Sequence, residues 1–218
     1  MKNRLTILCG DWVERLRELP GESVHCVVTS PPYWGLRDYG VAGQLGLEAT
    51  PDEYVSKMVE GFREVRRVLR KDGTCWVNLG DAYAHGKPGG GCVFANGRTD
   101  GRRFYVKDNA RGREKLKTLA RGLKPKDLVG IPWRVAFALQ ADGWWLRQDI
   151  IWHKPNPMPE SVTDRCTKAH EYIFLLTKSA RYFYDVEAVK EAVSGTAHPR
   201  QPSNGKPPSM AFKMEAAG

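Results

Sequence analysis

The sequence lacks any long hydrophobic run. No apolar stretch approaches the roughly 18 residues of a membrane span, and residues 1–11 hold no run that could serve as a signal peptide. These absences predict a soluble, cytoplasmic protein with no membrane partner.

The sequence also lacks the patterns of a disulfide framework or a metal site. Its five cysteines are odd in number and far apart, and Cys9, Cys26 and Cys75 fall in apolar segments typical of strands. His170-Glu171 has no second histidine at the spacing of a zinc-binding helix. We therefore expect reduced, mostly buried thiols and no bound metal.

The positive charge is high and concentrated in one segment. The chain has 218 residues and a formal net charge of +9, which favours a polyanionic partner, although many basic proteins bind only counterions. Residues 98–126 contain eleven Lys and Arg against three acidic residues. This segment is either a solvated insertion or a site that neutralises DNA phosphates. We favour DNA contact, by the segment that includes Arg102, Arg103, Arg111 and Arg113.

Apolar periodicity and helix caps predict alternating strands and helices. Strands are expected over 5–9, 24–29, 74–79, 144–152 and 172–177, with helices that begin after Asp11, after Thr50 and at Pro132. The strand 24–29 is apolar on both faces, as a central parallel strand would be. We expect an α/β fold with a Rossmann-like, mostly parallel sheet and helices on both faces. Ligands in such sheets bind at the carboxyl ends of the strands.

The segment Ser30-Pro31-Pro32-Tyr33 lies directly after the second predicted strand. In one interpretation the prolines only end the strand, and Tyr33 packs on the rim of the core. In the other, the prolines stiffen the backbone, so that the carbonyls of Ser30 and Pro31 are fixed acceptors for an amino group. Ser30 adds a hydroxyl oxygen, and Tyr33 adds a ring on which a planar base can stack.

This motif resembles the signature of the DNA amino-methyltransferases, in which Ser, Asp or Asn precedes Pro-Pro and an aromatic residue. These enzymes methylate N4 of cytosine or N6 of adenine. Three longer stretches are similar to the same family: LCGDWVERLRELPGESVHCVVTSPPYWGLRDYG, FREVRRVLRKDGTCWVNLGDAY and DIIWHKPNPMPESVTDRCTKAHEYIFLLTKS. The resemblance covers most of residues 5–185, and the order of the motifs resembles that of the circularly permuted members.

The resemblance implies a base flipped out of double-stranded DNA and stacked on Tyr33. The Ser30 hydroxyl and the Pro31 carbonyl would accept its two amino N–H bonds and leave the nitrogen lone pair free for direct methyl transfer. No covalent intermediate is needed, in agreement with the absence of a Pro-Cys nucleophile motif. The predicted catalytic residues are Ser30, Pro31, Pro32 and Tyr33.

Further contacts to DNA or to the base are predicted at Trp34, Arg37, His153 and Lys154. For three of them another role is open. Trp34 could be a core residue, Arg37 could pair with Asp38 on the surface, and His153 could lie on the rim beside a proline turn.

The cofactor implied by the resemblance is S-adenosylmethionine. Asp11 is expected near its adenosine part, although a role as a helix cap, with Glu14 three residues on, also explains it. Asn78, Gly80 and Asp81 are expected to line the same crevice. The Phe-x-Gly-x-Gly cofactor loop that permuted members have after the catalytic motif is absent from the chain.

We therefore expect a methyltransferase sheet that is incomplete at its C-terminus. Residues 1–193 form the predicted catalytic domain with a basic insertion at about 84–126, and residues 194–218 form a tail that begins the missing part. A second chain could complete the cofactor site. The predicted function is methylation of DNA, with cytosine N4 favoured over adenine N6 because serine precedes the prolines. The alternative is a catalytically silent or fragmentary DNA-binding protein derived from such an enzyme.

Overall fold

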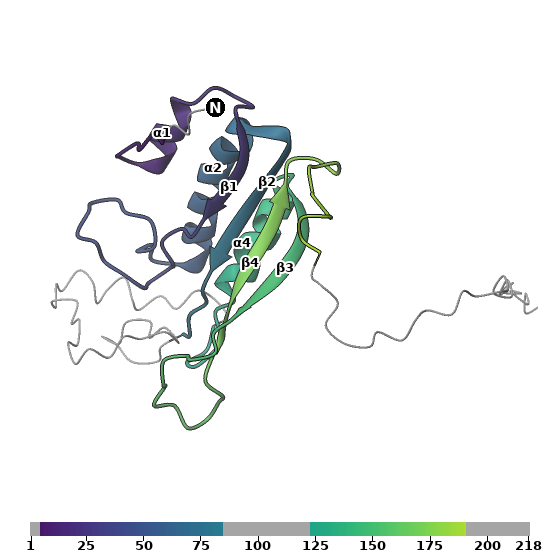
Figure 1. Cartoon of the computed structure of the whole chain (residues 1–218). Helices are drawn as coiled ribbons and strands as arrows, with labels where there is room; N and C mark the ends of the chain where they lie inside the picture. The colour runs from purple at the N-terminus through teal and green to yellow at the C-terminus, as the bar shows by residue number, and fades with distance from the viewer. Residues whose placement is uncertain (1–4, 85–122, 191–218) are drawn as a thin grey trace, which may run out of the picture. The chain divides into compact units, whose positions relative to one another are not determined.

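A computed structural model describes residues 5–84 and 123–190 (Figure 1). Its elements are α1 (Trp12–Arg17), β1 (Val24–Thr29), α2 (Pro51–Val68), β2 (Leu69–Leu79), α4 (Ile131–Ala141), β3 (Trp145–His153) and β4 (His170–Thr177). All of them belong to a compact unit that ends at Phe183, whereas residues 184–190 belong to a second unit. Most of the predicted basic insertion, with Arg102, Arg103, Arg111 and Arg113, lies outside the described residues, as does the predicted tail.

The four strands form one sheet in the order β1-β2-β4-β3. β1 and β2 are parallel, whereas β4 is antiparallel to both of its neighbours, β2 and β3. The predicted α/β class is confirmed, but the sheet is mixed rather than mostly parallel. Apolar periodicity gives no strand direction, because a strand buried on both faces is apolar whether its neighbours are parallel or antiparallel.

The two long helices, α2 and α4, pack on the same face of the sheet (Figure 1). The core between them and the sheet contains alternate residues of β2 and β4: Cys75, Val77, Leu79, Phe174 and Leu176. Within the described parts of the chain these helices cover one face only, so the prediction of helices on both faces is wrong there. Asn78 alternates with the core residues of β2 and therefore lies on the opposite face.

Helix α2 begins as the sequence predicts. The Thr50 hydroxyl accepts a hydrogen bond from the Glu53 amide at 3.1 Å, and Pro51 occupies the first turn. The helix ends at Val68, and β2 starts at Leu69, five residues before the predicted start at Thr74. The reason is tertiary, because Leu69 is fully buried and pairs with Val24 of β1.

β1 lies at the edge of the described sheet, where a central strand was predicted. Val28, which alternates with the core-packed Val27, faces the side that no described helix covers and is 79% exposed. Residues 5–9 form no strand, and Leu5 and Ile7 are more than four-fifths exposed, because no strand of the described part pairs with them. Phe137 of α4 is more than half exposed.

The cysteines are less buried than predicted. Cys9, Cys26 and Cys166 are exposed free thiols, and Cys75 alone among the four described cysteines is buried. Cys26 lies on the edge strand, where its face of the sheet is uncovered. Apolar neighbours in the sequence therefore do not by themselves bury a side chain.

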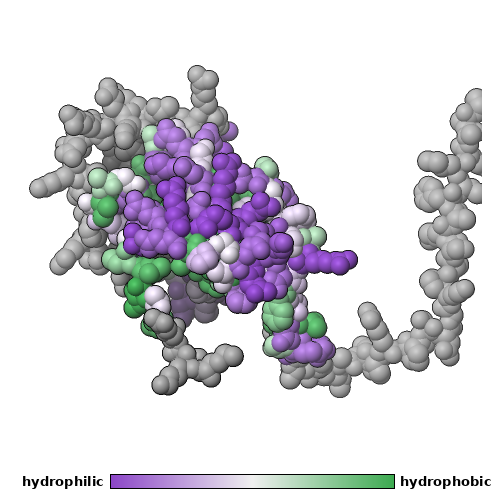
Figure 2. Space-filling view, turned by 90° about the horizontal axis from the view of Figure 1, so that it is seen from above, coloured by the Kyte–Doolittle hydropathy of each residue, from purple (hydrophilic) through white to green (hydrophobic). Residues whose placement is uncertain are grey.

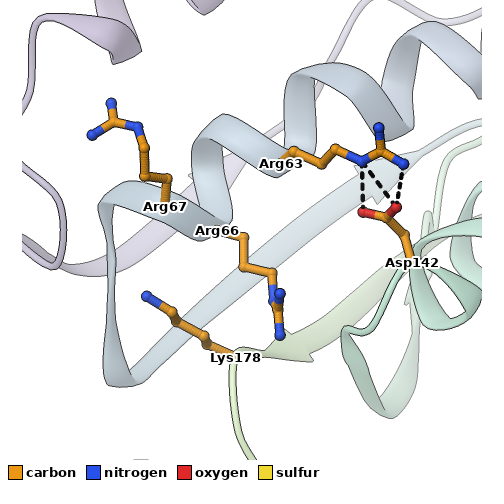
Figure 3. A pocket seen from close by; sticks show the side chains of 5 residues that line it. All are labelled: Arg63, Arg66, Arg67, Asp142 and Lys178. Carbon is orange, nitrogen blue, oxygen red and sulfur yellow. Dashed lines mark hydrogen bonds and ion pairs between the residues drawn. The ribbon is translucent and has the colours of Figure 1, made fainter.

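The end of the molecule where α2 passes into β2 is mostly hydrophilic (Figure 2). A hollow of about 220 Å³ there is lined by Arg63, Arg66, Arg67, Asp142 and Lys178 (Figure 3). Arg63 donates to Asp142 at 2.6 and 2.9 Å, whereas Arg67 donates to the carbonyls of Leu16 and Leu19 at 2.8 and 3.1 Å. Carbonyls at the end of a helix have no partner within it. Arg67 therefore anchors the end of α1 to α2.

Replacing Arg67 with methionine should release α1. We expect the free energy of unfolding to fall by about 1–3 kcal/mol, because two hydrogen bonds from a charged donor are lost. Amide hydrogen exchange in residues 12–19 should become faster, as measured by mass spectrometry. Arg63→Met, which removes an exposed ion pair from the same helix, is the control. Equal exchange of α1 in the two variants would contradict the anchoring role of Arg67.

Candidate active site

Residues far apart in the sequence meet at the end of the sheet where β1 and β2 finish; this end is called the site edge below. Ser30 follows β1 and Gly80 follows β2, and the two strands are parallel, so both residues lie at the site edge. The antiparallel register pairs Leu79 with Tyr172 and His170 with His153. This register brings the start of β4, with Glu171, and the end of β3, with Lys154, to the site edge.

The side-chain oxygens at this edge form one hydrogen-bonded cluster. The Tyr33 hydroxyl lies 2.5 Å from Oδ1 of Asn78 and 3.2 Å from Oε2 of Glu171. The Ser30 hydroxyl lies 3.3 Å from both the Tyr33 hydroxyl and Oδ1 of Asn78. The amide of Asn78 donates to the Tyr172 carbonyl at 3.2 Å, which turns its oxygen toward the two hydroxyls. The Ser30 proton is thus directed into the protein, although Ser30 itself is exposed.

Ionisation in this cluster is set by burial and by Glu171. Burial raises the pKa of Tyr33 to about 12, with a further contribution from the charge of Glu171 and an opposing one from the Ser30 hydrogen bond. The phenol is therefore neutral near pH 7. Burial also opposes the charge of Glu171, but Lys154 and the hydrogen bonds from Asn78 and Tyr33 outweigh it and lower the pKa of that carboxyl.

The proline backbone is held by α2. The buried Tyr54 donates its hydroxyl proton to the Pro32 carbonyl at 2.9 Å. Pro31 is buried, and within residues 5–84 and 123–190 no donor reaches its carbonyl. The Pro31 carbonyl, predicted to accept an amino N–H, therefore has no hydrogen bond within the described protein.

Two of the residues predicted to bind the cofactor have clear structural roles. A Cβ at Gly80 would lie 2.7 Å from Cε2 of Tyr33, so glycine leaves the space that this ring occupies. Oδ1 of Asp81 accepts the amides of Ala82, Gly130 and Ile131 at 2.8 to 2.9 Å. Gly130 has no side chain to cap α4, and Asp81 supplies the cap from the end of β2. Cofactor contact by Asn78, Gly80 and Asp81 stays a prediction.

Asp11, Trp34, Arg37 and His153 share no side-chain hydrogen bond with this cluster in the described part of the chain. Asp11 is exposed and caps α1 by accepting the amides of Val13 and Glu14. Trp34 packs against the core and donates to the Glu48 carbonyl at 2.9 Å. Arg37 and His153 are exposed, and Asp38 accepts the Gly40 amide. Their contacts to cofactor or DNA stay predictions.

Sequence reasoning missed the role of Glu171. Its signal was a carboxylate at the start of an apolar strand, which was considered only as half of a zinc motif. It also missed Lys168, whose Nζ is buried without a hydrogen-bond partner in the described part and whose pKa is lowered by burial. Among the described residues no group of three or more His, Cys, Asp or Glu side chains could hold a metal ion. None of the described helices is both long and apolar enough to cross a membrane.

Replacing Gly80 with alanine should displace the Tyr33 ring. The ring cannot simply swing away, because Asn78 and Glu171 hold its hydroxyl. We expect the free energy of unfolding to fall by about 1–3 kcal/mol and the ring NMR signals of Tyr33 to shift. Gly21→Ala is the control, since its added Cβ would make only an ordinary contact at 3.6 Å. Unchanged Tyr33 signals in Gly80→Ala would contradict the tight packing of this ring.

Comparison with known proteins places the chain among DNA methylases. A family model described as DNA methylase matches residues 24–216. The Type II methyltransferase M.Cfr9I of Citrobacter freundii is 52% identical over 193 residues, which are 87% of this chain and 59% of that protein. M.SmaI of Serratia marcescens is 52% identical over 188 residues, 86% of this chain and 61% of that protein. The chain thus spans about three-fifths of the length of these relatives.

A solved structure supports the fold. The PvuII DNA methyltransferase, described as cytosine-N4-specific, superposes with a TM-score of 0.53 at 20% identity, over 83% of this chain and 51% of that protein. At this identity the likeness concerns the fold alone. With the family match and the 52% identical relatives, it confirms the resemblance that the Ser-Pro-Pro-Tyr motif indicated. The chain belongs to the N6/N4 DNA methylase family.

Proposed function

We propose that the site edge, with Ser30 and Tyr33, binds the amino group of a base flipped from double-stranded DNA. The protein would methylate this group, with cytosine N4 favoured over adenine N6. The observation that supports the proposal is the direction of the Ser30 hydrogen bonds. Its proton points toward Asn78 and Tyr33, which leaves the lone pairs of an exposed oxygen for an incoming donor.

The chemistry of the amino group explains why acceptors matter. An exocyclic amine shares its lone pair with the aromatic ring and is a weak nucleophile. Two acceptors placed for a pyramidal nitrogen favour the form whose lone pair is available. Ser30 Oγ and the Pro31 carbonyl are the proposed pair, and the neutral Tyr33 phenol is the proposed stacking surface.

S-adenosylmethionine supplies the methyl group when it is bound. Asp11, Asn78, Gly80 and Asp81 are its proposed contacts, although Asn78 and Oδ1 of Asp81 already make hydrogen bonds within the protein. The fit of these four residues is therefore partial. We propose that further polypeptide, in a longer chain or in a second one, completes the cofactor site.

DNA contact is proposed for Trp34, Arg37, His153 and Lys154 and for the basic segment. Arg37 and His153 are exposed, as a contact to DNA requires. The proposed role of the basic segment is to neutralise phosphates, and binding should then weaken as the salt concentration rises.

Ser30→Ala should strongly lower the rate of methyl transfer while the fold is retained. The test is incorporation of a tritiated methyl group from S-adenosylmethionine into unmodified DNA. We expect a fall of about 100-fold or more, comparable to the loss of one preorganised polar group in other active sites. Ser56→Ala, which removes an exposed hydroxyl from α2, is the control. Digestion of the labelled DNA to nucleosides then identifies the methylated base.

The other outcomes are equally informative. Transfer that survives Ser30→Ala would contradict the assigned site. DNA binding without any transfer by the wild-type protein would favour the silent DNA-binding alternative, and label on N6 of adenine would overturn the preference for cytosine.

A further inference from the structure

We infer that Lys154 and Glu171 form a positioning pair that directs the hydroxyl protons of the site inward, so that Ser30 presents only lone pairs to its ligand. The inference deepens the proposed function and depends on it for the nature of that ligand, an exocyclic amino group. Glu171 itself touches neither base nor methyl donor and would act through Tyr33.

The geometry gives the two oxygens of Glu171 separate partners. The residue is 7% exposed. Oε1 accepts from Nζ of Lys154, which follows β3, and Oε2 lies 3.2 Å from the Tyr33 hydroxyl. Because an ionised carboxylate has no proton, the hydrogen in the contact with Tyr33 can come only from the phenol.

Counting protons shows why the charge matters. With Glu171 ionised, Asn78 Oδ1 and Glu171 Oε2 can only accept, so the single phenol proton is shared between these two oxygens and the Tyr33 oxygen is left to accept. The Ser30 proton then has two acceptors inside the cluster, the Tyr33 oxygen and Asn78 Oδ1, each at 3.3 Å. A protonated Glu171 would donate to the Tyr33 oxygen and compete with Ser30 for it. Ser30 would then keep only Asn78 Oδ1, which already accepts the phenol proton, and its proton would turn outward more often, where it would oppose an amino N–H.

The surroundings of Glu171 keep it ionised. Burial disfavours its charge, but Lys154 contributes both a hydrogen bond and an opposite charge that lower its pKa. Lys168, which precedes β4, is a second cation with an electrostatic interaction with Glu171, and Tyr33 is neutral near pH 7. Lys154 is the cation in direct contact with Glu171, so its loss should change the pKa of Glu171 most.

A site that offers only hydrogen-bond acceptors, Ser30 Oγ and the Pro31 carbonyl, selects a class of base. It binds the 4-amino group of cytosine or the 6-amino group of adenine, each of which donates two N–H bonds. It disfavours uracil and thymine, which place a carbonyl oxygen at the corresponding position, because two acceptors would then face each other. The pair would thus contribute to the choice of substrate as well as to the reaction.

The pair can be tested without a methyl-transfer assay, by measuring the pKa of Tyr33. In protein labelled with ¹³C-tyrosine, with the Tyr33 signal assigned through Tyr33→Phe, the wild-type pKa should be about 12. In Glu171→Gln it should fall by about one unit, because the carboxylate that raises it is gone. Glu160→Gln, which alters another carboxylate with little exposure, paired with Arg165, should leave it unchanged. An unchanged Tyr33 pKa in Glu171→Gln would overturn the proposal.

A second measurement leaves Glu171 in place. Lys154→Met should raise the pKa of Glu171 by about one unit or more, followed by the ¹³C signal of its carboxyl group, whereas Lys154→Arg should retain the low value. A Glu171 pKa that is the same in wild type and Lys154→Met would overturn the pair.

The kinetic counterpart separates this proposal from the proposed function. Glu171→Gln should lower kcat about 10-fold, with the KM for DNA changed less than about twofold, because the buried Glu171 acts on the reacting geometry rather than on DNA binding. Failure of the wild-type protein to transfer methyl groups would refute the proposed function, and the titrations would still decide the pair. Methyl transfer by the wild-type protein, together with a Tyr33 pKa that does not change in Glu171→Gln, would refute the pair and leave the proposed function intact.

Discussion

The hydrogen bond between the Tyr33 hydroxyl and the Asn78 amide oxygen, 2.5 Å long, ties the loop after β1 to the end of β2. The rest of the site depends on this tie. It presses the Tyr33 ring against Gly80 and places the Ser30 hydroxyl beside two oxygens that can take its proton. The same segment is also held by the Tyr54 contact to Pro32 and by the Trp34 hydrogen bond to the Glu48 carbonyl, but neither of these reaches β2.

The same residues support the fold and the proposed chemistry. Asp81 caps α4, Asp11 caps α1, and Tyr54 connects α2 to the proline backbone. Asp81 and Asp11 are themselves proposed cofactor contacts, and Tyr54 holds the carbonyl of Pro32 beside the proposed base site. A rigid site built from loops at the ends of strands needs such support. Loop backbone without fixed partners would let the acceptors move away from a productive geometry.

The exposed edge of the sheet is consistent with the proposal that further polypeptide completes the cofactor site. β1 is parallel to β2, has no partner on its other side among the described residues, and exposes Val28. Proteins normally cover such edges, because unpaired strand backbone invites association with other chains. The curated relatives extend well beyond the length that this chain matches.

Local sequence patterns were enough to predict most of the elements and the family. Capping residues, apolar stripes and the Ser-Pro-Pro-Tyr motif are properties of neighbouring positions, so they predicted α1, α2, α4 and all four strands of the described sheet, together with a strand over 5–9 that does not form. Strand direction, the edge position of β1 and the early start of β2 at Leu69 follow from tertiary contacts. The tertiary structure also decided the place of Glu171, which is 138 residues from Tyr33 along the chain yet shares a hydrogen bond with it. Such contacts follow from the antiparallel pairing of β4 with β2, and pairing between distant strands leaves no periodic signal in either segment.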